Sequence, residues 1–120
     1  MNDVSSPMMY ALEKFLDVTS SRQKLVTANI ANVDTPGYRT KDIDFRGELQ
    51  RAVSGGGQAN FMPMARSVQG LLERPDGNNV SMDREGLLLA ESQMQYNLGI
   101  QLLKHQFQNL LYAIHEGNNT

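Results

Sequence analysis

The sequence is most informative where it reads Ala28-Asn29-Ile30-Ala31-Asn32-Val33-Asp34-Thr35-Pro36-Gly37-Tyr38-Arg39. Pro36 disfavours the helical conformation at Thr35, and Gly37 tolerates a positive φ, so a helix that enters this stretch ends before a sharp turn. Tyr38 then offers a large ring with a polar tip, and Arg39 offers a charge to a neighbouring surface. The stretch therefore predicts a helix end, a turn and an anchor in direct succession.

The helical part of this stretch has the residues of a packing surface. Ala28 and Ala31 are small enough to let another helix approach closely, and Ile30 belongs to the apolar stripe of the helix. Asn29 and Asn32 carry amide groups that can fix the register of packed helices at some cost in stability. The same composition is also compatible with an ordinary polar helix C-terminus, so composition alone leaves both interpretations open.

Upstream of the turn, the sequence predicts a helix over residues 6–33. Ser5 or Ser6 can cap its start, and Pro7 in the first turn loses no hydrogen bond there. Steps of three and four residues, which are heptad spacing, separate the members of one stripe along this helix. The stripe consists of Met9, Leu12, Leu16, Thr19, Gln23, Val26, Ile30 and Val33.

A second helix is predicted over residues 81–116, with Ser81 or Asp83 as its cap. Its stripe again alternates steps of four and three and consists of Leu89, Gln93, Tyr96, Ile100, Leu103, Phe107, Leu110 and Ile114. Further apolar residues lie beside the stripe, more than one small monomer can bury. Gly99 weakens the helix by about 1 kcal/mol relative to alanine but permits a neighbouring helix to come close.

Between the helices, residues 34–80 are expected to be a turn followed by a flexible or partly β segment. No sustained periodicity is visible from 39 to 79, and residues 54–58 have the composition of a flexible linker. Residues 67–73 are compatible with a short strand or a turn. A stretch of this length without regular structure is uncommon in a compact domain, which indicates a segment that orders on assembly or stays mobile. The fold class predicted for residues 1–120 is therefore a single, mainly α domain whose N- and C-terminal helices pair as a coiled-coil-like hairpin.

Composition excludes several classes of function. The chain has 120 residues, of which 40% are apolar and 20% charged, no cysteine and a net charge of -2. The lack of cysteine excludes disulfides and thiolate chemistry, no apolar run approaches the ~20 residues of a membrane span, and scattered Lys and Arg argue against binding of nucleic acid. The first nine residues have neither the basic nor the apolar region of a secretory signal peptide, so we expect any export to use a route that does not read one.

Few side chains are candidates for chemistry. His105 and His115 have no carboxylate or second histidine at ligand spacing, so polar-face histidines are favoured over a metal or catalytic site. Asp42 and Asp44 alternate around Ile43 and would share one face of an extended segment, but no other groups converge on them. We therefore interpret these aspartates as part of a solvated turn. The sequence predicts no enzyme, no cofactor, no metal and no small-molecule substrate.

Residues 28–39 resemble the motif of the flagellar rod, hook and hook-associated family, in which an N-terminal helix ends in Asn-Ile-Ala-Asn and is followed by Thr-Pro-Gly-Tyr and a basic residue. Residues 41–45, 78–85 and 89–96 resemble the short rod members of that family. The resemblance implies a structural subunit of the proximal rod of the flagellar basal body, which transmits torque and lines the export channel. It also implies export from the cytoplasm to the periplasmic rod by the type III system, without a cleaved signal peptide.

The partners that the resemblance implies are copies of the chain itself, other flagellar rod proteins, and the export-gate or adaptor end of the basal body, which is FliE-like. The residues expected to carry assembly are Ala28, Asn29, Ile30, Ala31, Asn32, Thr35, Pro36, Gly37, Tyr38, Arg39, Tyr96, Ile100, Leu103, Phe107, Leu110 and Ile114. An alternative function is a small helical chaperone or adaptor of the same export system. Such a protein would lack the Thr-Pro-Gly-Tyr turn and would fold as a compact, stable dimer.

Overall fold

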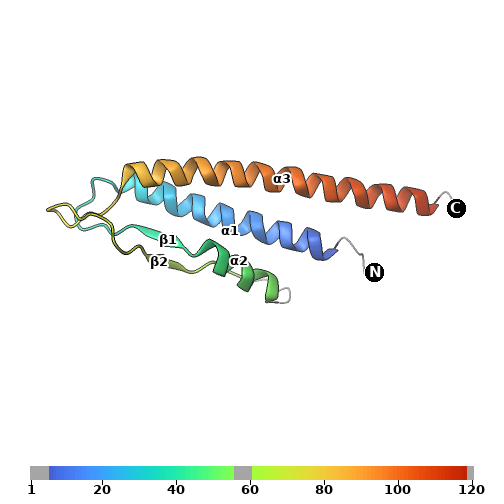
Figure 1. The fold of residues 1–120 in the computed structure, drawn as a ribbon, viewed down its shortest axis with the longest axis horizontal. Helices are drawn as coiled ribbons and strands as arrows, with labels where there is room; N and C mark the ends of the chain where they lie inside the picture. Colours follow the sequence, from blue (N-terminus) through green and yellow to red (C-terminus); the bar gives the residue numbers. More distant parts are fainter. Residues whose placement is uncertain (1–5, 56–60, 119–120) are drawn as a thin grey trace.

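The computed structural model of the chain describes residues 6–55 and 61–118. Helices α1 (Ser6–Ala31) and α3 (Met82–Asn118) run antiparallel along a molecule of 71 × 25 × 18 Å. Figure 1 shows α1 between α3 and a second layer, which contains β1 (Lys41–Ile43), α2 (Phe45–Ser54) and β2 (Ala65–Ser67). The predicted hairpin of terminal helices with a partly β middle is thus confirmed.

Helix α1 packs on both sides, which explains why its buried residues form more than one stripe. Val18, Thr19 and Val26 are almost fully buried, and the Thr19 hydroxyl donates a hydrogen bond to the Phe15 carbonyl at 2.7 Å. That bond satisfies a hydroxyl for which the core offers no water. The helix ends at Ala31, two residues before the predicted end, because the next residues already form the turn.

Helix α3 starts at the predicted cap. The Ser81 hydroxyl accepts a hydrogen bond from the Arg84 amide at 3.2 Å, and the Ser81 carbonyl accepts one from the Glu85 amide at 2.9 Å. These are the bonds of a serine N-cap, which satisfy amide groups that have no partner inside the helix. Of the two caps that the sequence left open, Ser81 therefore makes the capping bond.

The line of closest packing on α3 differs from the predicted stripe. Glu85, Ser92 and Gly99, at steps of seven, are the buried centre, whereas Gln93 of the predicted stripe is exposed. A Cβ atom at Gly99 would come within 2.7 Å of the Leu16 side chain. Small residues thus let α1 approach, and the predicted apolar residues flank that line instead of forming it.

The prediction that residues 39–79 lack helical periodicity is wrong for α2. Phe45, Leu49 and Ala52 recur at helical spacing over only ten residues, too short a segment to stand out from the sequence. Contacts with α1 stabilise this short helix. The Phe45 ring meets Phe15 edge-on with centroids 5.6 Å apart, and the Tyr10 hydroxyl donates a hydrogen bond to the Ala52 carbonyl at 3.2 Å. The predicted linker at 54–58 lies largely outside the described residues.

Two short strands continue this second layer. In the antiparallel pair, Lys41 lies opposite Ser67 and Ile43 lies opposite Ala65. A hydrogen bond from the Val68 amide to the Thr40 carbonyl, at 3.1 Å, extends the pair by one step. The segment for which the sequence allowed a strand or a turn, 67–73, therefore contributes only its first residue to a strand, since β2 ends at Ser67.

Candidate assembly site

The end of the molecule where α1 passes into β1 and α3 begins contains a buried cluster of charges, and we call it the closed end. Asp42 accepts hydrogen bonds from Arg22 of α1, at 3.1 and 3.0 Å, and from Arg84 of α3 at 2.7 Å. Its residue exposure is 7%. The interpretation of Asp42 as part of a solvated turn is therefore wrong, because two arginines distant in sequence enclose it; Asp44, at the start of α2, is exposed as expected.

The charge of Asp42 is stabilised in this place. Burial raises the pKa of its carboxyl group, but hydrogen bonds from Arg22, from the Ile43 amide and from Arg84 outweigh burial and hold the pKa below the ordinary value. The carboxylate thus ties β1 to both long helices at once. A buried ion pair of this kind requires all its members, because the loss of one leaves an uncompensated charge.

Asn29 joins the same three elements through its side-chain amide. Its nitrogen donates to Glu85 of α3 and to the Lys41 carbonyl of β1, both at 2.8 Å. Its oxygen accepts from the Tyr38 hydroxyl at 2.9 Å and from the Lys41 amide at 3.2 Å. Asn29 and Glu85 are fully buried, and burial together with the Glu85 charge raises the pKa of Tyr38. The amide therefore fixes the register of α1 and α3 from inside the chain.

The turn that follows α1 is held by a second asparagine, on the segment between β2 and α3. Asn78 is fully buried, and its side-chain nitrogen donates to the carbonyls of Asn32 and Thr35, each at 2.9 Å. Gly37, with φ of +75°, donates its amide to the Asp76 carbonyl at 2.8 Å. The turn is thus built for this internal contact, while Thr35 and the neighbouring Pro36 stay exposed.

The predicted charge of the turn also has partners within the chain. Arg39 donates to the Gly77 carbonyl at 3.2 Å and forms an ion pair with Glu73 at 3.4 Å, with both side chains about half exposed. Next to it, the buried Thr40 amide donates to the Asn79 side chain at 2.7 Å. Arg39 therefore stabilises the turn from within the chain, and its exposed half stays accessible to a neighbour.

The outer face of α1 carries the two alanines of the predicted packing surface. Ala28 and Ala31 are exposed and line an open hollow of about 540 Å³ together with Ser20 and Thr27 and with the longer side chains of Gln23 and Lys24, all of the same helix. The four short side chains leave room for a neighbouring helix to approach, and Gln23 and Lys24 line the same space. Ile30, by contrast, points partly into the molecule and is half-buried.

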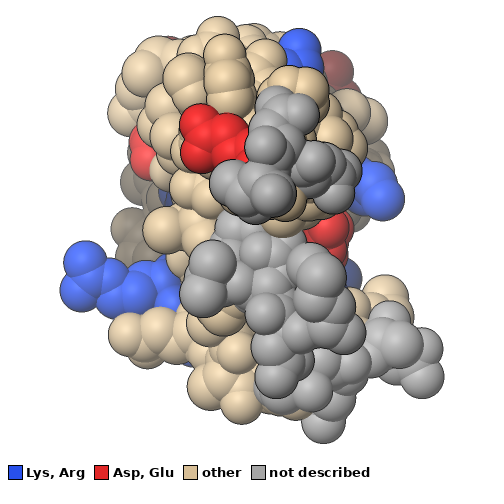
Figure 2. Space-filling model, turned by 90° about the vertical axis from the view of Figure 1, so that its right-hand side faces the viewer, with Lys and Arg blue, Asp and Glu red and all other residues tan. Residues whose placement is uncertain are grey.

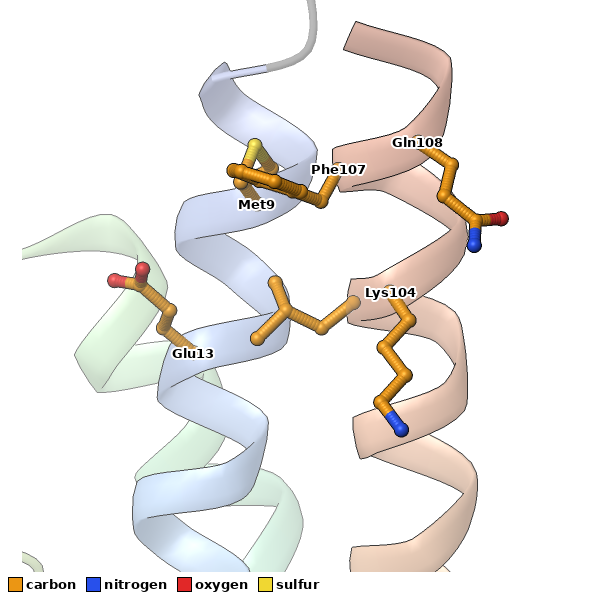
Figure 3. A pocket seen from close by; sticks show the side chains of 6 residues that line it. Met9, Glu13, Lys104, Phe107 and Gln108 are labelled. Carbon is orange, nitrogen blue, oxygen red and sulfur yellow. The ribbon is translucent and has the colours of Figure 1, made fainter. Parts of the chain in front are cut away.

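The opposite end of the hairpin, which we call the open end, has an apolar surface. Met9 of α1 and Phe107 of α3 turn toward each other in Figure 3 and, with Leu103, form the apolar part of an open hollow of about 460 Å³. Glu13, Lys104 and Gln108 also line this hollow. Figure 1 shows α3 extending beyond α1 here. Phe107 adjoins Met9, near the start of α1, and Ile114 lies about 10 Å further along α3, where it is 47% exposed. Uncharged residues make up most of the described surface at this end, as Figure 2 shows.

The predicted α3 stripe runs from the middle of the helix, at Tyr96 and Ile100, into the open end. Tyr96, Ile100, Leu103 and Leu110 are half-buried along the side of α3 that adjoins α1, whereas Phe107 is about half exposed. The structure therefore does not gather the predicted residues into one site. It separates them into an internal polar cluster, a small-residue face on α1 and an apolar surface at the open end.

Neither a metal site nor a membrane-spanning helix occurs in the parts of the chain that the structure describes. No three His, Asp or Glu side chains among residues 6–55 and 61–118 come close enough together to hold an ion. Within the same residues, no helix combines the length and the apolar character needed to cross a bilayer.

The chain is similar to known proteins of one family. Residues 11–39, which include most of α1 and the turn after it, match the model of the flagella basal body rod protein family. The chain is 32% identical over 126 aligned positions to the flagellar basal body rod protein FlgB of Escherichia coli strain K12, covering 88% of this chain and 91% of that protein. The chain belongs to the FlgB family. FlgB of Salmonella typhimurium strain LT2 is likewise 32% identical with the same coverage, and FlgB of Borrelia hermsii is 30% identical over 84% of this chain and 90% of the relative.

Membership of the FlgB family identifies the chain as a structural subunit of the flagellar basal body rod, and it does not favour the alternative of an export chaperone or adaptor. The family match ends with the turn that the sequence singled out. The charged members of the closed end, Arg22, Asp42, Arg84 and Glu85, were not predicted as site residues. Arg84 and Glu85 lie in the first turn of the predicted second helix, but Arg22 lies inside the predicted first helix and Asp42 in the middle segment, so sequence spacing could not connect them.

Proposed function

We propose that the rod subunit divides its tasks between its two ends. The closed end fixes the angle and register of α1 and α3, and the open end supplies contacts to neighbouring subunits in the rod. The observation that carries this proposal is the half-exposed state of Phe107 and Ile114 on the part of α3 near and beyond the start of α1. Burial of such apolar surface is worth roughly 25 cal/mol per Å², which a subunit gains only from a neighbour.

The small-residue face of α1 is the second contact in this proposal. The hollow beside Ala28 and Ala31 can accept a helix from the next subunit, because short side chains allow helix axes to come close. This surface and the open end differ in position and in shape. A contact between two different surfaces continues from copy to copy, and where the rotation does not close a ring it produces an open helical assembly.

The neighbours in the assembly would be copies of this chain, other rod proteins, and a FliE-like adaptor at the export-gate end. In this position the subunit transmits torque, lines the export channel and has no catalytic role. It would occupy the proximal, periplasmic part of the rod after export without a cleaved signal peptide. Support comes from the family, from the resemblance of residues 28–39 to the rod and hook motif, and from the exposed apolar side chains of Phe107, Leu111 and Ile114 at the open end.

The test is complementation of a strain that lacks this subunit. Ile114→Lys places a charge on the open end without disturbing the helix, because lysine favours helix and suits its C-terminal part. We expect the variant to be folded by circular dichroism but absent from purified basal bodies, in a strain that does not swim.

The control is Leu72→Lys, which changes an apolar side chain that is 90% exposed but lies near the turn of the closed end. This variant should enter basal bodies and restore swimming. Normal swimming with Ile114→Lys would contradict the role of the open end. A wild-type chain that stays in the cytoplasm while rods are completed would indicate a chaperone or adaptor instead.

A further inference from the structure

The segment that holds the end of α1 contains a peptide bond that can rearrange without an enzyme. Asp76 is the only aspartate of the chain that a glycine follows, and no asparagine of the chain precedes a glycine. In an Asp-Gly pair the glycine nitrogen can attack Cγ of the aspartate, because glycine has no side chain to hinder the approach. The side chain of Asp76 is 41% exposed, so water reaches its carboxyl group.

The rearrangement is an intramolecular condensation followed by hydrolysis. A bond forms between the Gly77 nitrogen and Cγ of Asp76, and the nitrogen proton and a carboxyl OH leave together as water. The resulting five-membered succinimide then takes up one water molecule. Cleavage of the bond to Cγ restores aspartate, whereas cleavage of the original peptide bond gives isoaspartate. The water lost equals the water gained, so no oxidant, reductant or cofactor takes part.

In the folded chain, hydrogen bonds hold both reacting groups. The Gly77 amide donates to the Arg74 carbonyl at 2.9 Å, and a carboxyl oxygen of Asp76 accepts from the Asn78 amide at 3.0 Å. The nitrogen must leave Arg74 and the carboxyl group must leave Asn78 before the two can react. Ring closure therefore requires the turn at residues 74–78 to open.

Contact with the turn after α1 opposes this opening. Gly77 has a φ of +88°, and a Cβ atom there would lie 3.3 Å from Cα of Gly37. The Asp76 carbonyl accepts from the Gly37 amide at 2.8 Å, and the Gly77 carbonyl accepts from Arg39 at 3.2 Å. Ring closure rotates the peptide group between Asp76 and Gly77, so it would break both of these bonds.

We propose that Asp76 is a site of spontaneous isomerisation that the closed end suppresses, and that isoaspartate at this position keeps the turn open. In isoaspartate the main chain runs through Cβ and Cγ and is one carbon longer. The carbonyl that accepts from Gly37 becomes a free carboxylate outside the main chain. The turn can then no longer present its acceptors to Gly37 and Asn78 together, and the bonds from Asn78 to the carbonyls of Asn32 and Thr35 are weakened with it.

Another aspartate of the closed end provides an internal control. Asp34 is exposed, as Asp76 is, and lies in the turn that Asp76 contacts. The residue after it is Thr35, whose branched side chain crowds the nitrogen that would attack. Asp34 should therefore isomerise more slowly than Asp76 in an unfolded chain, where neither is protected.

The first test compares the folded and the unfolded full-length chain at the same neutral pH and temperature. Methyl transfer by an isoaspartyl methyltransferase measures isoaspartate, and mass spectrometry of peptides locates it. In guanidinium chloride, residue 76 should accumulate isoaspartate faster than Asp34. In buffer the rate at residue 76 should be about tenfold lower or less, because the turn opens rarely. Equal rates in the two solvents, or no isoaspartate at residue 76 in guanidinium chloride, would overturn the proposal.

A variant tests whether the closed end controls the rate. Asn78→Ala removes the side-chain bonds to Asn32 and Thr35 but leaves the Asp76-Gly77 pair intact. In buffer it should isomerise about tenfold faster than the wild type. The matched control is Leu72→Ala, at a side chain that is 90% exposed, and its rate should stay within about twofold of the wild type. Equal rates for the two variants would contradict control by the closed end.

Hydrogen exchange tests the effect of the product. The isomerised chain is separated by ion-exchange chromatography, and exchange at the Gly37 amide should be about tenfold faster than in the unmodified chain. The Met64 amide, which donates to Glu48 in the second layer, is the control and should keep its rate. Unchanged protection of Gly37 would show that the turn closes over isoaspartate, and would overturn the second half of the proposal.

Discussion

At the closed end, the buried side chains of Asn29 and Glu85 bond to each other across the two long helices, whereas at the open end Phe107 and Ile114 remain about half exposed to water. The first end stabilises itself with directional polar bonds inside the chain. The second end has apolar surface that the described part of the chain does not cover. The same helix, α3, therefore begins in a region that is complete and ends in a region that is not.

The difference follows from the physics of the two kinds of contact. A buried polar group left without a partner costs about 1–3 kcal/mol, so a cluster such as Arg22, Asp42 and Arg84 tolerates one arrangement of its members. Apolar contact depends on area rather than direction and accepts neighbours of different shape. A rod subunit that meets several kinds of neighbour benefits from a rigid polar end and an adaptable apolar end.

Replacing Asp42 with Ala should cause the largest loss of stability, about 3 kcal/mol in the free energy of unfolding, because Arg22 would lose its anion and Arg84 would keep only Glu85. Arg39→Ala is the control. It removes an ion pair with Glu73 in which both side chains are half exposed, and it should cost less than about 1 kcal/mol. Urea denaturation measures both. Equal losses would mean that the charge cluster does not hold the closed end.

Gly99→Val should cost about 1–2 kcal/mol, because a side chain there enters space occupied by Leu16 and Phe15 of α1. Gly86→Ala, on the exposed side of the same helix, should instead stabilise the chain by about 0.5–1 kcal/mol, since a Cβ atom there meets nothing within 4 Å. Thermal unfolding of the two variants distinguishes a close helix approach from helix propensity. A shift of the same sign in both would contradict the approach.

Local patterns made the long helices and the turn between them predictable from the sequence. Heptad spacing identified α1 and α3, and Pro36 with Gly37 identified the turn, because each acts on its immediate neighbours. The polar tie of α1 to α3 was also foreseen in part, since an asparagine in a helix seam is expected to fix register. Its partner, Glu85, was not foreseen.

Features that depend on distant residues could not be predicted in this way. Asp42 looks like a turn residue until Arg22 and Arg84, 20 and 42 positions away, are placed around it. The close approach of a helix at Gly99 was expected and is confirmed. The rest of the packing line of α3 was missed because Glu85 and Ser92 are not apolar. Helix α2 owes its place largely to Phe15, on another element.

Acid should lower the free energy of unfolding by less than Asp42→Ala does, because protonation of Asp42 removes its charge but not its side chain. The pKa of Asp42 in the folded chain lies below the ordinary value of 3.8, so folding favours the ionised form. Its contribution is complete above that value and is lost as the pH falls through the folded pKa.

The free energy of unfolding should therefore differ between wild type and Asp42→Asn by a constant amount near neutral pH and by less below about pH 4. Glu48 also has a lowered pKa, since hydrogen bonds from Arg51 and the Met64 amide outweigh its burial, but it titrates equally in both proteins. A difference that stays constant down to pH 2 would show that Asp42 does not act through its charge.

The smallest effect on stability is expected at the open end, where a change should affect assembly and not folding. Ile114 is 47% exposed on the part of α3 that extends beyond α1, so Ile114→Lys should change the free energy of unfolding by less than about 0.5 kcal/mol. The same variant is expected to be absent from basal bodies. An Ile114→Lys chain that keeps its stability but no longer enters the rod would show that the open end serves assembly and not folding. Asp42→Ala, in contrast, should lose stability. If Ile114→Lys unfolded as readily as Asp42→Ala, the open end would be part of the subunit's own core, and the exposed apolar residues of α3 could not be reserved for its neighbours.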